Sequence, residues 1–302
     1  MSSSRQKTGR GPSRRELLRT LGLSAVALPL GLLAACTRSS GSKSAVSGPA
    51  RGAAPRRAGW ATGGTAAMKG DYTDPFKAGL GSACTLTCAA TLGPCYAETL
   101  TRKDISEGQL GLPLRMAFLI VDEKCRPIRG ATLDIWHTAP SGLYSGAETS
   151  QMCTLGDPKA RASRWFRGMQ TSDENGRVDF DSCFPGWYSS RTIHVHFSVR
   201  IGQTEYVTSQ LFFDDALSDQ IVAGEPLYRE RGARDTTNQN DGVVSANEVG
   251  AYSFQTERMA DGVMLAWKTL VIRGSADSAL CSLAGGARGM GGGMPPHRPP
   301  PF

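Results

Sequence analysis

The stretch Ile193-His-Val-His-Phe-Ser-Val199 decides how the rest of the sequence is interpreted. It has the character of a β-strand, and alternate side chains of a strand point to the same face of a sheet. The imidazoles of His194 and His196 are therefore expected to project together. A His-x-His pair on a strand is by itself more often structural than functional, so the neighbouring motifs must indicate what the pair does.

Two tyrosines accompany the histidines. Tyr188 closes a Pro-Gly-Trp-Tyr motif just before the strand, and Tyr144 closes a Gly-Leu-Tyr motif further upstream. A free phenol ionises only near pH ~10, so a phenolate ligand needs a strongly charged ion that keeps it deprotonated. Zinc instead takes His, Cys and carboxylate ligands. Two phenols and two imidazoles that converge therefore predict a non-haem Fe(III) site.

These motifs belong to an ordered series that resembles the intradiol ring-cleavage dioxygenases. The series spans roughly residues 84–275 and consists of Leu92-Gly-Pro-Cys-Tyr96, Gly130-Ala-Thr-Leu-Asp-Ile-Trp136, Gly142-Leu-Tyr144, Arg167-Gly-Met-Gln-Thr-Ser-Asp173, Asn175-Gly176, Pro185-Gly-Trp-Tyr188, Arg191 to His196 and Gln210-Leu-Phe-Phe213. The resemblance implies an enzyme that uses Fe(III) and O2 to open a catechol between its two oxygenated carbons. The product would be a cis,cis-muconate-type diacid.

The resemblance also implies roles for the four ligands. Tyr188 and His196 would be axial, and Tyr144 and His194 equatorial. Catechol would bind as a bidentate ligand, and Tyr188 would then leave the metal and accept a substrate proton. Tyr144 would stay bound throughout.

Four further residues are candidates around the metal. Arg191 matches the family arginine three residues before the first ligand histidine, and its charge would stabilise negative charge on the activated ring. Gln210 matches a glutamine that hydrogen-bonds near the ligands. Tyr96 and Trp187 are candidates for the wall of the substrate pocket, although burial in the core is nearly as good an interpretation for each.

Two other functions remain open. One is a copper or zinc redox protein that uses His194 and His196, but it lacks a suitable set of Cys and Met partners and leaves Tyr188 without a role. The other is a non-catalytic ligand-binding lipoprotein on the same fold, which would not require Arg191. The sequence does not choose among catechol, protocatechuate and hydroxyquinol as the substrate.

The first 36 residues have the features of an export signal. Ser13-Arg-Arg-Glu-Leu-Leu18 is a twin-arginine pattern, and the apolar run Leu21–Ala35 is too short to span a membrane. Leu33-Ala-Ala-Cys36 resembles a bacterial lipobox. We therefore expect export and a lipid anchor at Cys36 on the cell surface, with simple cleavage without a lipid as the alternative.

The remainder is expected to comprise a flexible tether at 37–80, one domain at 81–281 and a disordered Gly/Met/Pro tail at 282–302 that contains His297. The net charge of +7 comes from the ends, because residues 1–80 hold thirteen Arg and Lys against three Asp and Glu. The domain itself is acidic overall. Nucleic-acid binding is therefore not expected, whereas a homo-oligomer remains possible.

The domain is predicted to be all-β, an antiparallel β-sandwich with long loops at 145–168 and 226–250. No long stretch shows helical periodicity. Turn residues separate the expected strands, which are Leu114–Val121, Thr132–His137, Arg177–Cys183, Ile193–Arg200, Glu205–Phe213, Ser253–Arg258 and Val263–Ile272. His137, which follows a tryptophan on one of these strands, is interpreted as structural or as a neighbour of the ligands.

Cysteine is abundant in this domain. Apart from Cys36 there are seven: Cys84, Cys88, Cys95, Cys125, Cys153, Cys183 and Cys281. An exported chain meets an oxidising compartment, so disulfides are expected, with their connectivity open and at least one thiol left over. The alternative is a soft-metal site at Cys84, Cys88 and Cys95.

Overall fold

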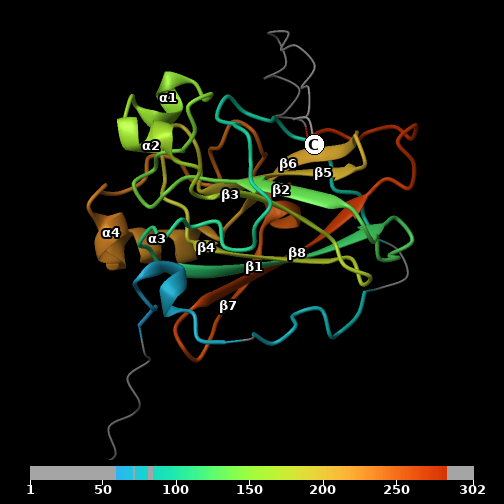
Figure 1. The fold of residues 1–302 in the computed structure, drawn as a ribbon, viewed down its shortest axis with the longest axis horizontal. Coiled ribbons are helices and arrows are strands. Elements are labelled where there is room, and N and C mark those ends of the chain that lie inside the picture. The colour runs from blue at the N-terminus through green and yellow to red at the C-terminus, as the bar shows by residue number, and fades with distance from the viewer. Residues whose placement is uncertain (1–58, 71, 81–83, 284–302) are drawn as a thin grey trace, which may run out of the picture. The chain divides into compact units, whose positions relative to one another are not determined.

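The computed structural model describes residues 59–70, 72–80 and 84–283 (Figure 1). The twin arginines, the lipobox with Cys36, and His297 in the C-terminal tail lie outside these residues. Within them, no helix has both the length and the apolar character needed to cross a membrane.

Eight strands of the described residues form two four-stranded sheets (Figure 1). The first has the order β4-β1-β8-β7 and contains β1 (Pro113–Asp122), β4 (Arg177–Cys183), β7 (Gln255–Arg258) and β8 (Met264–Ile272). The second has the order β3-β2-β5-β6 and contains β2 (Thr132–Trp136), β3 (Arg167–Thr171), β5 (His194–Ile201) and β6 (Thr204–Phe212). Neighbouring strands are antiparallel except β1 and β8, which are parallel. The predicted β-sandwich is confirmed, with this one parallel pair added.

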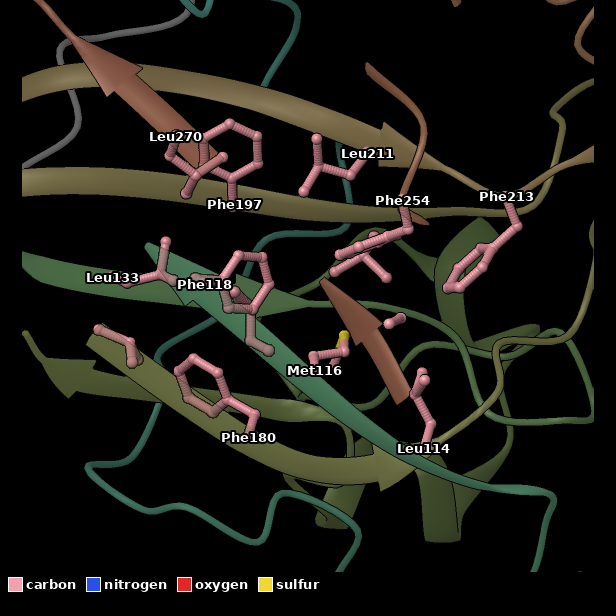
Figure 2. Packing of buried hydrophobic residues seen from close by; sticks show 14 of the residues in the cluster. Leu114, Met116, Phe118, Leu133, Phe180, Phe197, Leu211, Phe213, Phe254 and Leu270 are labelled. Carbon is pink, nitrogen blue, oxygen red and sulfur yellow. The ribbon is translucent and has the colours of Figure 1, made fainter. Parts of the chain in front are cut away.

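The space between the sheets is filled by alternate side chains of the strands (Figure 2). From the first sheet, β1 contributes Met116 and Phe118, and from the second, β5 contributes Val195 and Phe197, all four fully buried. Each large apolar side chain buried in this way stabilises the fold by about 1.5–3 kcal/mol. Because the odd-numbered residues of β5 fill the core, its even-numbered residues, among them the two histidines, must lie on the outer face of the second sheet.

Strand β3 was missing from the sequence prediction. Its residues lack an apolar alternation, and Gly168 weakens the strand pattern. The glycine is required by tertiary packing, because a Cβ there would lie 2.4 Å from Cγ2 of Ile105. Pairing with the edge of β2 makes this segment a strand, which the sequence pattern alone does not indicate.

The structure adds one helix of ten residues to the predicted strands. Helix α3 (Asp215–Gly224) begins where the Asp214 carboxylate accepts a hydrogen bond from Leu217 N at 2.9 Å, which is the usual N-cap arrangement. The two predicted loops contain short helices, and the first also runs into the start of β3. The helices are α1 (Gln151–Thr154), α2 (Pro158–Ala162), α4 (Pro226–Arg229) and the 3-10 helix η2 (Val249–Tyr252), which extends just past the second loop.

Residues 59–70 and 72–80 fall in the segment expected to be a flexible tether, yet they pack against the domain. They include the 3-10 helix η1 (Gly64–Ala67). Tyr72 Oη donates to Asp261 at 3.0 Å, and Arg115 of β1 lies 4.9 Å above the Tyr72 ring. Asp74 forms an ion pair with Arg177 of β4 at 2.6 Å. Part of the expected tether therefore covers the outer face of the first sheet.

The described residues contain three disulfides, which are Cys84–Cys125, Cys88–Cys281 and Cys95–Cys153. Cys183 is a buried thiol. The prediction of disulfides with one thiol left over is thus confirmed. The alternative of a soft-metal site at Cys84, Cys88 and Cys95 is wrong, because each of these sulfurs is already bonded to another cysteine.

Candidate metal centre

The centre is built on a row of three residues that crosses the second sheet. Trp136 of β2 pairs directly with His196 of β5, which in turn pairs with Gln210 of β6. Directly opposed residues of antiparallel strands share a face, so the three side chains lie together on the outer side. His194 lies two residues before His196 on that same face.

The four predicted ligand residues come together at one point. Nε2 of His194 lies 3.3 Å from Tyr144 Oη, 3.3 Å from Tyr188 Oη and 3.0 Å from Nε2 of His196. Tyr144 and both histidines are at most 3% exposed, whereas Tyr188 is half-buried. The prediction from sequence that two phenols and two imidazoles converge therefore agrees with this geometry.

Hydrogen bonds leave part of this cluster unsatisfied, because Nδ1 of the buried His196 has no hydrogen-bond partner among the described residues. His194 Nδ1 lies 2.6 Å from the Thr192 carbonyl oxygen, so it donates its proton there and leaves a single lone pair on Nε2. That lone pair faces two phenols and a second imidazole nitrogen, and it can accept a strong hydrogen bond from only one of them. Four lone-pair-bearing atoms around one point are instead the arrangement that a bound cation requires.

Burial keeps all four groups neutral when no cation is present. It raises the pKa of Tyr144 well above its ordinary value, and it raises the pKa of Tyr188 although Arg191 works in the opposite direction. Burial, helped by Arg191, lowers the pKa of His194 to about 3, and burial also places the pKa of His196 far below its ordinary value. The imidazoles are therefore unprotonated and ready to bind a metal, whereas the phenols must first lose their protons.

Neighbouring rings and a tight turn fix the orientation of His196. Its ring stacks on the indole of Trp136, with centroids 5.0 Å apart and planes at 7°. The loop that carries the Leu92-Gly-Pro motif crosses the other side. Gly93 has φ +76°, and a Cβ there would lie 3.0 Å from Cε1 of His196. The glycine of this motif is thus explained by the close approach of the backbone to the His196 ring.

The disulfide Cys95–Cys153 supports the Tyr144 side of the centre. Tyr144 N donates to Cys153 O at 2.9 Å, and both cysteines pack with Tyr144 and Trp136 in one buried cluster. The guanidinium of Arg167, which is fully buried, lies 5.9 Å from the Tyr144 ring centre and donates to Cys95 O at 2.6 Å. Sequence reasoning quoted Arg167 within a motif but assigned it no role. Its place at the start of the motif Arg167-Gly-Met-Gln-Thr-Ser-Asp173 was the sequence signal that could have identified it.

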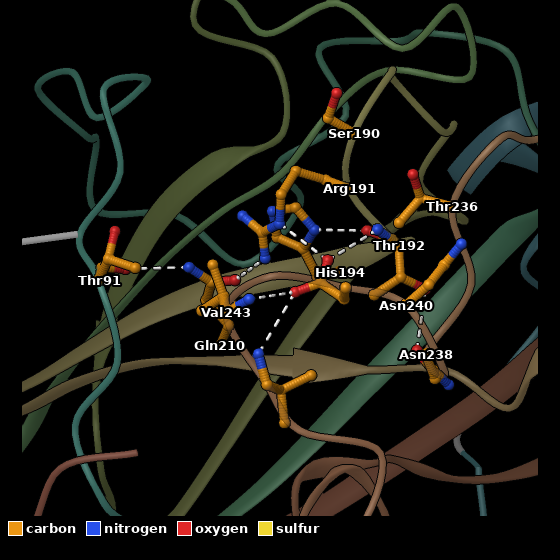
Figure 3. Close-up of polar contacts among 12 residues, drawn as sticks. Thr91, Ser190, Arg191, Thr192, His194, Gln210, Thr236, Asn238, Asn240 and Val243 are labelled. Atoms are coloured by element: carbon orange, nitrogen blue, oxygen red, sulfur yellow. Dashed lines mark hydrogen bonds and ion pairs between the residues drawn. The ribbon is translucent and has the colours of Figure 1, made fainter. Parts of the chain in front are cut away.

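Arg191 lies beside Tyr188. It is held by two partners, one of which is Gln210 (Figure 3). Its Nε donates to Asp241 Oδ2 at 2.9 Å, and its Nη2 donates to Oε1 of Gln210. Gln210 Nε2 in turn donates to the Thr91 carbonyl at 3.0 Å. Gln210 therefore lies beside His196, with which it pairs across the sheet, and its amide oxygen is bound by Arg191. Asp241 has no local sequence signal and was missed.

The two candidates for the pocket wall have different surroundings. Tyr96 packs edge-on against Trp136 at 4.8 Å, and its Oη donates to the buried carboxylate of Asp134 at 2.9 Å. Trp187 donates through Nε1 to Gly232 O at 3.2 Å, with Arg231 4.8 Å from its ring centre. Tyr96 thus adjoins the metal centre, whereas Trp187 is tied to the loop after α4.

A surface groove of about 720 Å³ lies away from the donor atoms, lined by residues that include Pro140, Leu227 and Arg231.

His137 takes no part in the centre. Its ring is buried and bonded to Ser182 Oγ and the Thr138 carbonyl, both at 2.8 Å. It is structural, in agreement with one of the two interpretations from sequence.

The comparisons with known proteins all find dioxygenases. The model of the dioxygenase family matches residues 90–255. A chlorocatechol 1,2-dioxygenase from Pseudomonas putida is 27% identical over 105 residues, and the match covers 36% of that protein, so the chain spans about a third of its length. An intradiol ring-cleavage dioxygenase from Tetranychus urticae superimposes with a TM-score of 0.56 at 28% identity, over 63% of this chain and 95% of that one. A second dioxygenase structure gives a TM-score of 0.54 at 28% identity over the same shares of the two chains. Because the family match includes more than half of the chain, the chain belongs to the intradiol ring-cleavage dioxygenase family.

Proposed function

We propose that this protein is a non-haem Fe(III)-dependent dioxygenase that opens a catechol-type ring between its hydroxylated carbons. One catechol and one O2 would give one cis,cis-muconate-type diacid, with both oxygen atoms retained in the product. A single observation carries the proposal: two phenol oxygens and Nε2 of His196 lie within 3.3 Å of Nε2 of His194.

The donor set fits Fe(III). Phenolate is a hard anionic donor, and both phenols have a raised pKa in the absence of a cation. Only an ion of high charge holds two such groups deprotonated. Two phenolates and two neutral imidazoles from Tyr144, Tyr188, His194 and His196 leave one positive charge of Fe(III) uncompensated, and this charge favours an anionic catecholate. When bound, Fe(III) would supply the Lewis acidity that ionises catechol and the electron demand that activates the ring toward O2.

The side chains of this protein would divide the remaining work. Tyr144 is almost fully buried and is fixed through its backbone to Cys153, so it suits a permanent ligand. Tyr188 is half-buried, so it has the freedom to move and accept a proton from the substrate. Arg191, beside Tyr188, would stabilise negative charge on the ring. Tyr96 and Trp187 are proposed as lining residues of the substrate pocket, the latter with the weaker support.

The surroundings of the two histidines weigh against a copper or zinc redox site. The further donors beside them are phenol oxygens, and the described residues contain no group of three or more His, Cys, Asp and Glu suited to a metal ion. A non-catalytic binding protein on the same fold would need neither the four convergent donors nor the tethered Arg191.

Colour and product analysis test the proposal together. Phenolate bound to Fe(III) absorbs visible light, so an iron-loaded sample should be red to burgundy, and its band should shift when catechol is added without O2. With O2, a panel of catechol, protocatechuate and hydroxyquinol should yield diacids that contain two atoms of supplied 18O. A blue copper-loaded sample, or a colourless protein that binds no iron, would contradict it.

We further propose that the protein is exported through the twin-arginine route and anchored by a lipid on Cys36. The three disulfides support an oxidising location. Replacement of Cys36 by Ser should release the protein from the membrane fraction, and replacement of Arg14 and Arg15 by Lys should leave precursor in the cytoplasm. A Cys36→Ser variant that stays in the membrane fraction would rule out the anchor.

A further inference from the structure

We propose that Asp241 is a positioning residue that holds Arg191 and the metal-binding imidazole of His194 in register through one carboxylate. The inference rests on the proposed function for the roles of these two residues. It adds a third group, from a loop about fifty residues further along the chain, that acts on both.

The carboxylate of Asp241 accepts four hydrogen bonds. Oδ2 accepts from Arg191 Nε and from Thr192 N, each at 2.9 Å. Oδ1 accepts from the backbone N–H groups of Val243 at 2.8 Å and Val244 at 3.3 Å. The side chain is fully buried. Both oxygens thus face donors, which an ionised carboxylate satisfies and a neutral side chain does not.

One arm of this network orients Arg191. The bond from Nε to Asp241 and the bond from Nη2 to Gln210 fix the plane of the guanidinium at two points. A planar group held at two of its nitrogens cannot rotate about its own stem. The remaining edge is therefore kept beside Tyr188, where the substrate is proposed to bind.

The other arm reaches His194 through the backbone. Asp241 holds the N–H of Thr192, and the carbonyl of the same Thr192 accepts the Nδ1 proton of His194 at 2.6 Å. A second contact steadies this residue, since Thr192 Oγ1 donates to the buried Asn238 at 2.8 Å. The partner on the distal nitrogen of an imidazole fixes the tautomer and the ring orientation of a metal ligand. Asp241 therefore acts on the imidazole of His194 through a single residue, Thr192.

The substitution Asp241→Asn separates these roles from simple space filling. The amide has nearly the shape of the carboxylate, but its NH2 must face either the two valine N–H groups or the pair from Arg191 and Thr192. In the full-length iron-loaded protein we expect kcat to fall about 10–100-fold, with KM for catechol changed less. The visible band should also shift while most of the iron is retained.

The matched control is Asp74→Asn, which removes one charge from the ion pair with Arg177 of β4 on the other sheet. It should leave the band and kcat as in the wild type. If Asp241→Asn lowers only the melting temperature and keeps both the band and kcat, Asp241 is merely structural and the inference is overturned.

Nitrogen-15 NMR of the metal-free wild type gives a readout that needs neither a folded variant nor activity. His194 should be the Nδ1–H tautomer, and Arg191 Nε–H should exchange slowly with solvent. A His194 protonated on Nε2, or rapid exchange at Arg191, would overturn the inference. If the wild type opens no catechol, the proposed function fails, whereas these two signals still decide the role of Asp241.

Discussion

The two sheets present very different outer faces, although both turn apolar side chains toward the same core. On the first sheet, the charged side chains on the outer face of β1 and β4 each contact an opposite charge. Arg115 pairs with Asp181, and Arg177 pairs with Asp179 and Asp74. These pairs are partly exposed, and such pairs contribute only about 0–1 kcal/mol each. The charged side chains of β1 and β4 on this face are therefore already paired.

The outer face of β3-β2-β5-β6 instead gathers donors that do not satisfy one another. His194, His196, Tyr144 and Tyr188 are all uncharged groups whose lone pairs meet. They are buried under loops from distant parts of the chain. On the second sheet, the polar residues of the outer face form a candidate site because their lone pairs converge beneath loops. On the first sheet, the polar residues of the outer face form ordinary surface because their charges are already paired.

Removal of a donor from the second face should have the largest effect. The variants are His194→Ala and His196→Ala, and each loses a direct donor. Each should therefore lose most of the iron and essentially all activity. This loss should exceed the about 10–100-fold loss of metal affinity or activity that is typical when a residue hydrogen-bonded to a ligand is replaced. Iron analysis and the visible spectrum measure this. Full iron content with an unaltered band in either variant would show that the assigned histidine is not a ligand.

Tyr188→Phe should separate the two tyrosines. It removes the proposed proton acceptor, so turnover should fall about 10²–10⁴-fold, while the three remaining donors retain part of the iron. Tyr144→Phe, the contrasting variant, should mainly shift the visible band. Resonance Raman of the anaerobic catechol complex should show one tyrosinate in the wild type. Two tyrosinate signals, or normal turnover by Tyr188→Phe, would refute the assignment.

The core side of β5 should respond in stability rather than in chemistry. Phe197 directly follows His196 on β5, points to the opposite face of the strand and is fully buried between the sheets. Phe197→Ala should cost about 3–5 kcal/mol of unfolding free energy, measured by denaturant titration. The fraction of the variant that remains folded should keep the iron band of the wild type. A folded variant without the band would show that the core face of β5 also controls iron binding.

Iron binding should weaken as the pH falls. The pKa values of Tyr144 and Tyr188 are raised in the metal-free protein, so both phenols are protonated at neutral pH. Each must release its proton to bind iron, and the apparent affinity should therefore rise about tenfold per pH unit for each proton released. Competition titrations with a chelator of known pH dependence measure the slope. A flat profile would mean that the phenols are not ligands.

The smallest effect is expected on the first outer face. Asp74→Asn removes one exposed partner of Arg177, which keeps its contact with Asp179. The unfolding free energy should change by no more than about 1 kcal/mol, with the iron band and kcat unchanged. A loss of iron in this variant would show that the two faces are coupled.

Much of the centre could be predicted because its information is local. The alternation in β5 fixes which side of the strand carries His194 and His196, and the Pro-Gly-Trp-Tyr motif brings Tyr188 close in sequence. Strand β3 could not be predicted in this way, since its packing around Gly168 depends on Ile105, more than sixty residues away. Helix α3 was predictable from its N-cap Asp214 and was overlooked.

The sequence alone therefore determined the sandwich, the type of donor set and the presence of disulfides, because strand periodicity, ligand chemistry and cysteine content are properties of short segments or of composition. Tertiary structure decided which cysteines pair, where residues 59–70 and 72–80 pack and which carboxylate holds Arg191. Asp241 illustrates the physical reason. Nothing beside it in the chain distinguishes it from other loop aspartates, and its role arises only when folding brings Arg191 and Thr192 to its buried carboxylate.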